Sequence, residues 1–196
     1  ASKRSLDLIS LVCARWACHP YDVIRSAIPP RVASIEKMKW EAPFVDRPTA
    51  SSVREYVQLP AYRDPFQVLA EQINKVRGSG SILVIVPDNR SVLRLVKHLP
   101  EALVLDSDLP RSQRYQNFLR ARTTSAQVII GTRSAIFVDS PDLSSIVIFN
   151  ESSEQFFEVR SPGWNARDIA ILRARTENIA IYCVGYSPSA EVARLI

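Results

Sequence analysis

Apolar residues recur in two alternating patterns along the second half of the chain. Short, nearly continuous apolar runs predict strands, and longer stretches with apolar residues three and four positions apart predict helices. Continuous β-branched strands that alternate with amphipathic helices are typical of a parallel sheet covered on both faces. We therefore expect an α/β domain whose strand carboxyl ends meet at one edge, where open sheets bind their ligands. The predicted strands are 56–59, 82–86, 103–105, 127–130, 146–149 and 179–184, and the predicted helices are 66–77, 91–98, 112–120, 166–175 and 190–195.

The first 54 residues follow a different pattern. Helical spacing of apolar residues over 6–18 and 21–27 predicts two short amphipathic helices, and prolines follow each of them. The stretch 31–54 is mixed in charge and its apolar residues show no sustained periodicity, so we interpret it as a linker. We expect a small helical module, then this linker, then the α/β domain.

Composition limits the size of the core and the class of partner. A chain of 196 residues with 46% hydrophobic residues is long enough for one ordinary domain and a small appendage. The formal net charge of +5 suits an anionic partner but is also common in proteins that bind none. The only methionine is Met38, so we expect the chain to be a piece of a longer protein.

Cysteine and histidine spacing predicts no metal site and no disulfide framework. Cys13, Cys18 and Cys183 are an odd number and include no C-x-x-C pair, and His19 and His98 lie far apart. The longest apolar runs are far shorter than the roughly 20 residues that span a bilayer. We expect a cytoplasmic protein that contacts no membrane.

The segment after the first predicted strand lacks the residues of a phosphate-binding loop. Such a loop needs glycines with free amides, a Lys for the phosphates and a Ser or Thr for magnesium. The segment 60–65 has a proline at each end and no glycine, and it contains Arg63 and Asp64. A carboxylate at a helix start repels a triphosphate. We predict that Arg63 and Asp64 occupy a degenerate P-loop position and bind no nucleotide.

The strand 146–149 ends in Asn150 and Glu151, where a magnesium-binding Asp would be needed. A neutral amide binds a divalent ion far less well than a carboxylate. Glu151 could still orient a water, but without a phosphate cradle it has no substrate to act on. The alternative, which we favour over residual catalysis, is that Asn150 and Glu151 cap the strand and start a turn. We therefore predict no catalytic residue.

The heptapeptide GTRSAIF at 131–137 follows another predicted strand. Thr132 and Ser134 offer hydroxyls and Arg133 a guanidinium, and all three groups suit phosphate oxygens. The alternative is a turn in which Arg133 pairs with a carboxylate such as Asp168. The chemistry of the residues leaves both possibilities open.

These segments resemble the bacterial replication-restart helicases, the primosomal protein N′ or PriA family. The similar segments are GTRSAIF at 131–137, NARDIAILRAR at 165–175, ILVIVPD at 82–88 and the helical stretch 5–30. The resemblance implies a RecA-like, P-loop NTPase-type parallel sheet with flanking helices, preceded by a short helical segment. It assigns 1–30 to the helical end of a winged-helix-like DNA-binding region, 31–54 to the linker and 55–196 to a degenerate first helicase lobe.

The departures from the family pattern concern its ATPase motifs. The helicases carry a Gly-Lys-Thr loop where this chain has 60–65, an Asp-Glu-Glu-His box where it has 150–153, and a Gly-Ser-Ala-Thr-Pro motif where it has 185–188. The chain thus resembles the degenerate actinobacterial branch of the family. ATP and zinc are cofactors implied by the resemblance alone, as are an amino-terminal DNA-binding domain, a zinc-binding insert and a second lobe. The cysteines of that insert are absent from this sequence.

The resemblance predicts a DNA-binding replication-restart protein that recognises stalled or branched forks and helps to reload the replication machinery without hydrolysing ATP. Its expected partners are branched or single-stranded DNA, replication-restart proteins and single-strand-binding proteins. Two alternatives stay open: an ATP-dependent 3′-to-5′ helicase with unorthodox nucleotide binding, and a protein-interaction scaffold without DNA contact. For Trp164 we expect core packing in preference to base stacking. The residues predicted to contact the phosphate backbone are Thr132, Arg133, Ser134, Lys37 and Lys39.

Overall fold

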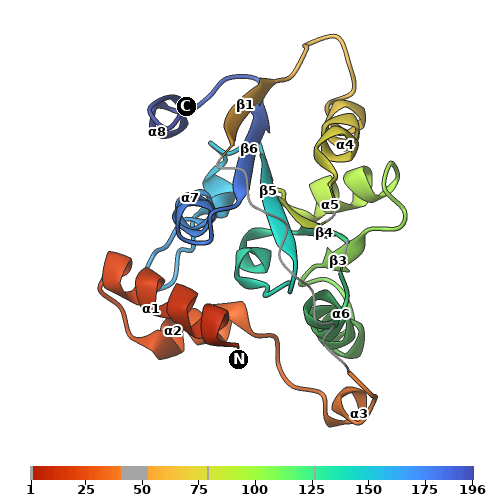
Figure 1. Ribbon diagram of the computed structural model, residues 1–196, viewed down its shortest axis with the longest axis vertical. Coiled ribbons are helices and arrows are strands. Elements are labelled where there is room, and N and C mark those ends of the chain that lie inside the picture. Colours follow the sequence, from red (N-terminus) through yellow and green to blue (C-terminus); the bar gives the residue numbers. More distant parts are fainter. Residues whose placement is uncertain (1, 41–52, 79, 126) are drawn as a thin grey trace.

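The computed structural model describes residues 2–40, 53–78, 80–125 and 127–196. Within them, six strands form one sheet in the order β1-β6-β5-β2-β4-β3, and every neighbouring pair is parallel (Figure 1). This sheet confirms the predicted α/β class. The strands are β1 (Arg54–Gln58), β2 (Ser81–Ile85), β3 (Leu103–Leu105), β4 (Val128–Gly131), β5 (Leu143–Phe149) and β6 (Ala180–Gly185).

The helices that the structure describes fall close to the predicted ranges, with three additions. Two are the 3-10 helices η1 (Arg133–Phe137), which lies within the heptapeptide 131–137, and η2 (Glu154–Phe156); the third is α3 (Ala33–Glu36) inside the predicted linker. Residues 41–52 of that linker lie outside the described residues. The remaining helices are α1 (Lys3–Trp16), α2 (Pro20–Ala27), α4 (Pro65–Val76), α5 (Asn89–Val96), α6 (Arg111–Thr123), α7 (Ala166–Thr176) and α8 (Ala190–Ala193).

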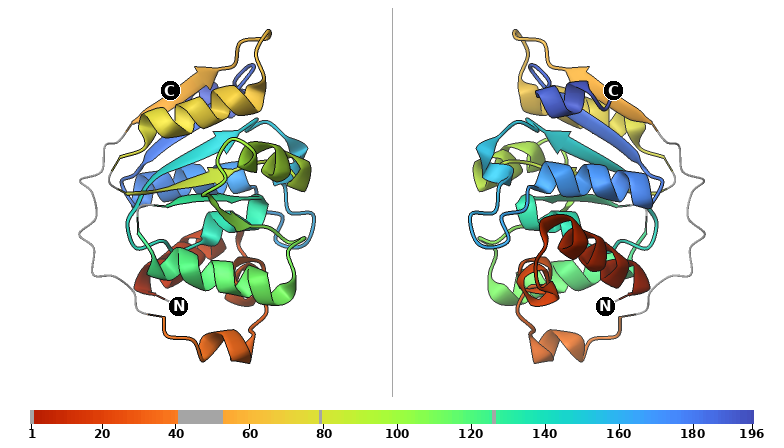
Figure 2. Two further views of the ribbon diagram at one scale, coloured as in Figure 1. Left: turned by 90° about the vertical axis from the view of Figure 1, so that its right-hand side faces the viewer. Right: turned by 90° about the vertical axis from the view of Figure 1, so that its left-hand side faces the viewer.

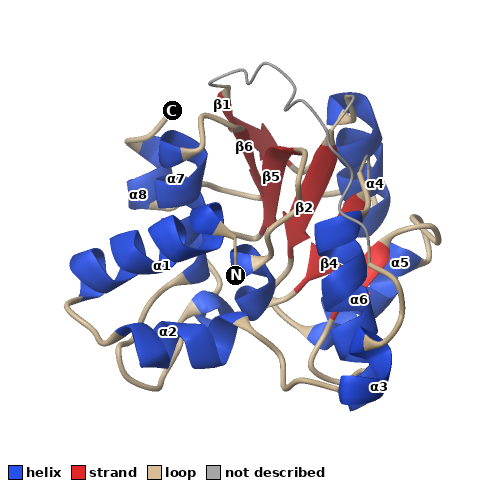
Figure 3. Ribbon diagram, turned by 60° about the horizontal axis from the view of Figure 1, so that its bottom comes forward, coloured by secondary structure: helices blue, strands red, loops and turns tan. Residues whose placement is uncertain are grey.

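Helices cover both faces of the sheet because the chain reverses its direction across it. It moves from β1 to β2 to β3 and then returns through β4, β5 and β6. Right-handed crossovers taken in opposite directions place their helices on opposite faces. In Figure 3, α4 and α5 accordingly lie to the right of the strands, and α7 and α1 lie to the left.

Strand β2 shows why its sequence is an unbroken apolar run. Ile82 and Val84 pack with α4 and α5, whereas Leu83 and Ile85 belong to the core on the opposite face. Every residue of β2 is buried. A strand buried on both faces favours apolar side chains throughout, which explains the apolar run from Ile82 to Ile85. The polar first residue, Ser81, is buried with its hydroxyl bonded to the Asp142 carboxylate.

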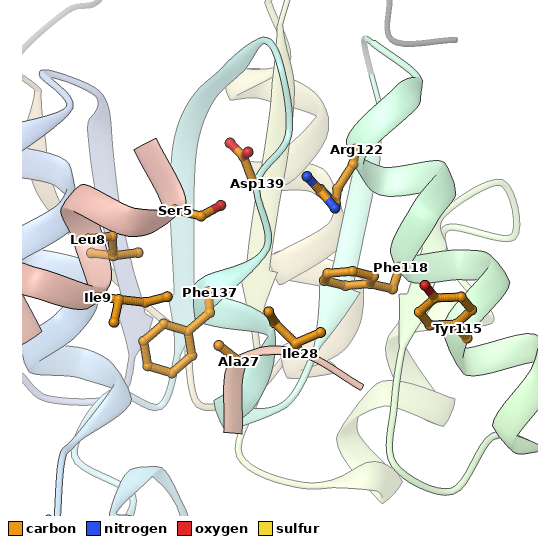
Figure 4. A pocket seen from close by; sticks show the side chains of 10 residues that line it. All are labelled: Ser5, Leu8, Ile9, Ala27, Ile28, Tyr115, Phe118, Arg122, Phe137 and Asp139. Atoms are coloured by element: carbon orange, nitrogen blue, oxygen red, sulfur yellow. The ribbon is translucent and has the colours of Figure 1, made fainter. Parts of the chain in front are cut away.

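The two amino-terminal helices share the core of the sheet. Leu8, Ile9 and Val12 of α1 and Val23 of α2 are buried with residues of β5, η1 and α7. A cavity of about 150 Å³ remains where α1, η1 and α6 meet, and Phe137 of η1 lies on its wall (Figure 4). The two helices therefore pack as part of the α/β core, whereas we had expected a separate small module. Their assignment to a DNA-binding region stays a prediction.

Helix α3 attaches the predicted linker to α6. The Glu36 carboxylate accepts a hydrogen bond from the Tyr115 hydroxyl of α6 and pairs with Arg31. Arg111 at the start of α6 donates from its guanidinium to the carbonyl oxygen of Arg31 over 2.9 Å. Figure 2 shows α3 beyond α6, at the end of the molecule opposite β1.

Candidate nucleic-acid interface

The loop after β1 is closed by an internal helix cap. The Asp64 carboxylate accepts hydrogen bonds from the backbone amides of Phe66, over 2.7 Å, and of Gln67, over 3.3 Å. The amide of Phe66 above all, followed by that of Gln67 and the charge of Arg94, holds the pKa of Asp64 below its usual value. These amides start α4, and amides at a helix start are the donors that a phosphate-binding loop offers to its ligand. Asp64 therefore takes up donors that a nucleotide would need.

Arg63, the other residue of the predicted degenerate P-loop, is paired on the same helix. Its guanidinium lies 2.6 Å from the Glu71 carboxylate of α4. The ion pair directs Arg63 along the surface of α4. Together with the Asp64 cap, it leaves neither predicted side chain without a protein partner.

Asn150 and Glu151 form a turn at the end of β5. Asn150 has a positive φ of 53° and accepts at its carbonyl a hydrogen bond from the Ser153 amide, over 3.0 Å. Glu151 is only 2% exposed. Its carboxylate accepts from the backbone amide of Ser189, over 2.6 Å, and from the Ser189 hydroxyl, over 2.9 Å. Since Ser189 is the N-cap of α8, Glu151 ties the end of β5 to that helix.

Arg167 of α7 completes this buried network. Its guanidinium lies 3.5 Å from Glu151, 3.0 Å from Asp168 and 3.5 Å from Glu191. Burial alone would lower the pKa of Arg167, but these carboxylates raise it above its usual value. Arg167 therefore stays charged at any physiological pH, and Glu151 has a permanent cationic partner. The geometry agrees with the cap-and-turn interpretation of Asn150 and Glu151.

The heptapeptide 131–137 is fixed between β3 and α7. A Cβ added at Gly131 would lie 2.7 Å from the carbonyl oxygen of Leu105 and 2.4 Å from the Cβ of Ala135, so only glycine fits there. The buried Arg173 of α7 donates to the carbonyl oxygen of Ile136 over 2.7 Å. Two of the four segments that carried the sequence resemblance, 131–137 and 165–175, thus contact each other directly.

A groove of about 880 Å³ opens at the carboxyl edge of β2, β3, β4 and β5. Thr132, Arg133 and Ser134 lie on its wall, so the structure brings these three predicted residues to one surface. Its acidic side chains include Asp88, which caps α5 by accepting from the Ser91 amide. The charged residues that line the groove are Arg25, Arg90, Arg114, Arg133, Arg160, Asp88, Asp108 and Glu158.

Four of these arginines have guanidinium groups without a protein partner. Within the described part of the chain, Arg25, Arg90, Arg114 and Arg160 make no side-chain ion pair or hydrogen bond. Sequence reasoning missed all four as groove residues. They come from α2, α5, α6 and the loop after η2, and no short motif contains two of them. Only the fold brings them together.

Among the described residues, Arg133 is the one groove arginine whose guanidinium has protein partners. Its guanidinium donates to the carbonyl oxygen of Phe157 over 2.6 Å and to that of Gln155 over 3.5 Å. It also lies 3.4 Å from the Glu158 carboxylate. The sequence alternative, in which Arg133 pairs with a carboxylate, agrees with this contact, but the partner is Glu158 and not Asp168, which pairs with Arg167.

The remaining candidates lie away from the groove. Lys37 and Lys39 are exposed just after α3 and do not line it. Trp164 is fully buried and meets Phe137 edge to face with ring centroids 5.2 Å apart, which confirms core packing and excludes base stacking.

Two further expectations concern metals and membranes. The described residues contain no cluster of three His, Cys, Asp or Glu side chains able to hold a metal ion. Among the helices that the structure describes, none combines the length and the apolar character needed to cross a bilayer.

The fold and the edge site define the class of protein. The chain superimposes on the C-terminal domain of the DEAD-box protein Dbp5 with a TM-score of 0.50, at 20% identity, over 73% of this chain and 80% of that one. This likeness concerns the fold alone and confirms a RecA-like sheet with flanking helices. No protein-family model matches the chain.

Sequence comparison finds relatives that are named replication restart proteins. The chain is 29% identical to the probable replication restart protein PriA of Mycobacterium tuberculosis and 27% identical to that of Mycobacterium leprae, over 96% of its length in both cases. It is 32% identical to the replication restart protein PriA of Haemophilus influenzae over 64% of its length. These matches confirm the resemblance that the motifs indicated. The chain spans about a third of the length of the mycobacterial relatives and 18% of the Haemophilus protein.

Proposed function

We propose that this chain is a DNA-binding lobe of a replication-restart protein, which holds the phosphate backbone in the carboxyl-edge groove and hydrolyses no ATP. The observation that carries the proposal is the set of four guanidinium groups in the wall of one groove of about 880 Å³, none of which has an ion pair or hydrogen bond to another described residue. Guanidinium groups bind phosphate oxygens with two parallel hydrogen bonds. Each phosphate contact also releases counterions, which makes such binding strongly dependent on salt.

The hydroxyl groups of Thr132 and Ser134 join this site as neutral donors, in agreement with the sequence prediction. Phosphate contacts of this kind position a nucleic acid without reading its sequence. A protein that recognises the shape of a fork needs contacts of this kind, because stalled forks occur at any sequence. Lys37 and Lys39 extend the proposed contact beyond the groove, on the side of α3.

The loss of ATP hydrolysis is supported by the two loops at β1 and β5. Asp64 brings a negative charge to the amides of α4, and Asn150 brings a neutral amide to the position where magnesium needs a carboxylate. Glu151 is held by Ser189 and Arg167 and is not free to act as a base. Without a metal or a phosphate cradle, phosphoryl transfer lacks the electrostatic stabilisation on which it depends.

The relatives carry the name replication restart protein, and the proposed partners follow from it. We propose that branched or single-stranded DNA binds the groove, and that replication-restart and single-strand-binding proteins contact the whole protein. We also propose that 55–196 acts as a degenerate first helicase lobe and that 1–30 continues a DNA-binding region that precedes it.

A salt titration of DNA binding tests the groove. The full chain and the double variant Arg90→Ala/Arg114→Ala are titrated against forked and single-stranded DNA at several salt concentrations, and fluorescence anisotropy gives the affinity. We expect weaker binding by the variant, with a slope of log K against log salt that is shallower by about 0.9 per lost phosphate contact on duplex and about 0.7 on single strands.

Arg120→Ala is the matched control, because Arg120 lies on α6 like Arg114 but lines a different surface groove. Its affinity and salt slope are expected to equal those of the unmodified chain. Unchanged DNA binding by the double variant contradicts the proposed interface. ATP binding tighter than about 0.1 mM, or about 5.5 kcal/mol, contradicts the loss of nucleotide chemistry.

A further inference from the structure

The segment between β5 and α7 forms a short hairpin, residues 157–164, beside the groove. Phe157 forms an antiparallel bridge with Asn165, and the amide of Glu158 donates to the carbonyl oxygen of Trp164 over 2.8 Å. Phe156 and Trp164 anchor its two ends, since both side chains are fully buried. The base of the hairpin is therefore part of the core.

The tip of the hairpin is exposed and carries a cation. Val159 is 82% exposed, and Arg160 lines the groove without a side-chain partner among the described residues. The amide of Arg160 donates to the Glu158 carboxylate over 3.1 Å, and the amide of Gly163 donates to the carbonyl oxygen of Arg160 over 2.8 Å. These two bonds close the turn, and the Glu158 carboxylate holds the backbone at Arg160, whose side chain lines the groove.

Arg133 supports the first strand of this hairpin from η1. The bond to the carbonyl of Phe157, the longer one to that of Gln155 and the ion pair with Glu158 all reach residues at or next to its first strand. The Arg133 side chain is 33% exposed and that of Glu158 is 12% exposed, so the contacts are partly shielded from water. Glu158 thus joins Arg133 to the turn that carries Arg160.

We infer that Arg133 acts on DNA binding as a positioning residue: it holds the hairpin so that the Arg160 guanidinium faces a phosphodiester backbone lying in the groove. The inference rests on the proposed function and deepens it, because it assigns direct contact to Arg160 and support to Arg133. In the direct role predicted from the sequence, Arg133 itself binds a phosphate. The two roles differ in what lysine at position 133 can do.

Lysine separates the roles because it keeps the charge but not the planar fork. An ammonium group binds phosphate as a point charge, so a direct contact partly survives the substitution Arg133→Lys. It cannot reproduce a guanidinium that bonds carbonyl oxygens and a carboxylate at the same time. For a positioning role, Arg133→Lys therefore behaves like Arg133→Ala.

The first experiment needs no DNA. Hydrogen exchange of the amides of Glu158, Arg160 and Gly163 is measured in the full chain and in the variants Arg133→Lys, Arg133→Ala, Glu158→Gln and Arg160→Ala. We expect roughly tenfold faster exchange in the two Arg133 variants, an intermediate effect in Glu158→Gln, and no change in Arg160→Ala. Thermal unfolding identifies any variant that has lost its fold. The exchange rates of Glu158→Gln and Arg133→Lys are then the ones compared with those of the unmodified chain. Unchanged exchange in folded Arg133→Lys overturns the inference.

The second experiment is a double-mutant cycle on DNA affinity and salt slope. Arg160→Ala is expected to weaken binding roughly five- to tenfold. It is also expected to make the slope of log K against log salt shallower by the amount that corresponds to about one lost phosphate contact. With a positioning role, Arg133→Lys weakens binding to a similar extent, and the double variant is no weaker than Arg160→Ala. Additive losses in the double variant, or retained affinity in Arg133→Lys, overturn the inference. If the unmodified chain binds no DNA, the proposed function fails, and the exchange data still decide whether Arg133 holds the hairpin.

Discussion

The buried carboxylate of Glu151 gives the sharpest test of whether the ATPase position has become structural. In the structure it accepts two hydrogen bonds from Ser189 and pairs with Arg167 over 3.5 Å. Replacing Glu151 by Ala removes these contacts and leaves the Ser189 amide and hydroxyl without their acceptor. A catalytic glutamate, in contrast, is replaced with little cost in stability.

The size of the effect follows from what remains around Arg167. Breaking a buried ion pair costs about 3–5 kcal/mol, and Arg167 keeps Asp168 at 3.0 Å and Glu191 at 3.5 Å. We therefore expect Glu151→Ala to lower the free energy of unfolding by about 3 kcal/mol, the lower end of this range. At about 2–4 °C per kcal/mol for a domain of this size, the melting temperature falls by roughly 6–12 °C. Glu151→Gln keeps an acceptor for the Ser189 amide and loses only the charge, so about 1–2 kcal/mol is expected.

Thermal unfolding followed by circular dichroism measures these differences, and an ATPase assay runs beside it. The control is Glu154→Gln, which removes the same charge from an exposed position in η2. It is expected to melt within about 2 °C of the unmodified protein. The reasoning is refuted if Glu151→Gln melts like the unmodified protein while abolishing an ATP hydrolysis that the unmodified protein displays.

Two further predictions concern the core. Leu8→Ala is expected to lower the free energy of unfolding by about 2–4 kcal/mol, because Leu8 packs with residues of the sheet. Thermal unfolding should then show a single cooperative transition at a lower melting temperature. An unchanged main transition would mean that α1 folds apart from the sheet. Cys183 is expected to resist alkylation by iodoacetamide at pH 8, because burial, followed by the charge of Glu151, raises the pKa of its thiol to about 12. The thiol favours folding below its unfolded pKa, and this contribution disappears as pH rises toward 12; equal labelling of folded and urea-unfolded protein would contradict the buried position.

The sequence was sufficient to predict most of the helices and strands, whereas the degenerate nucleotide site stays a prediction. The apolar run of β2 and the amphipathic spacing of α4 are local patterns, so both were predicted to within one or two residues. Residue type alone predicted that Asp64 cannot replace a phosphate-binding loop. It did not reveal that Asp64 caps α4 with its own carboxylate, although an Asp just before a helix is a common cap.

Contacts between residues that lie far apart in the chain could not be predicted from the sequence. The sequence suggested Asp168 as a carboxylate partner of Arg133. In the structure Asp168 pairs with its neighbour Arg167, and the hairpin brings Glu158 to Arg133. Sequence reasoning likewise placed α1 outside the core, because an amphipathic helix does not indicate what covers its apolar face. Such pairings depend on which segments the sheet brings side by side.

Periodicity along the chain determined by itself that this protein has a parallel sheet, and residue chemistry predicted that the sheet lacks a nucleotide cradle. Only the tertiary structure decided that the arginines of α2, α5, α6 and the hairpin share one groove, and that Glu151 is bound by Ser189 and Arg167. The physical reason is how far apart in the sequence the interacting residues lie. Secondary structure follows from neighbours a few residues apart, whereas a site at the carboxyl edge is assembled by crossovers that join residues far apart in the sequence.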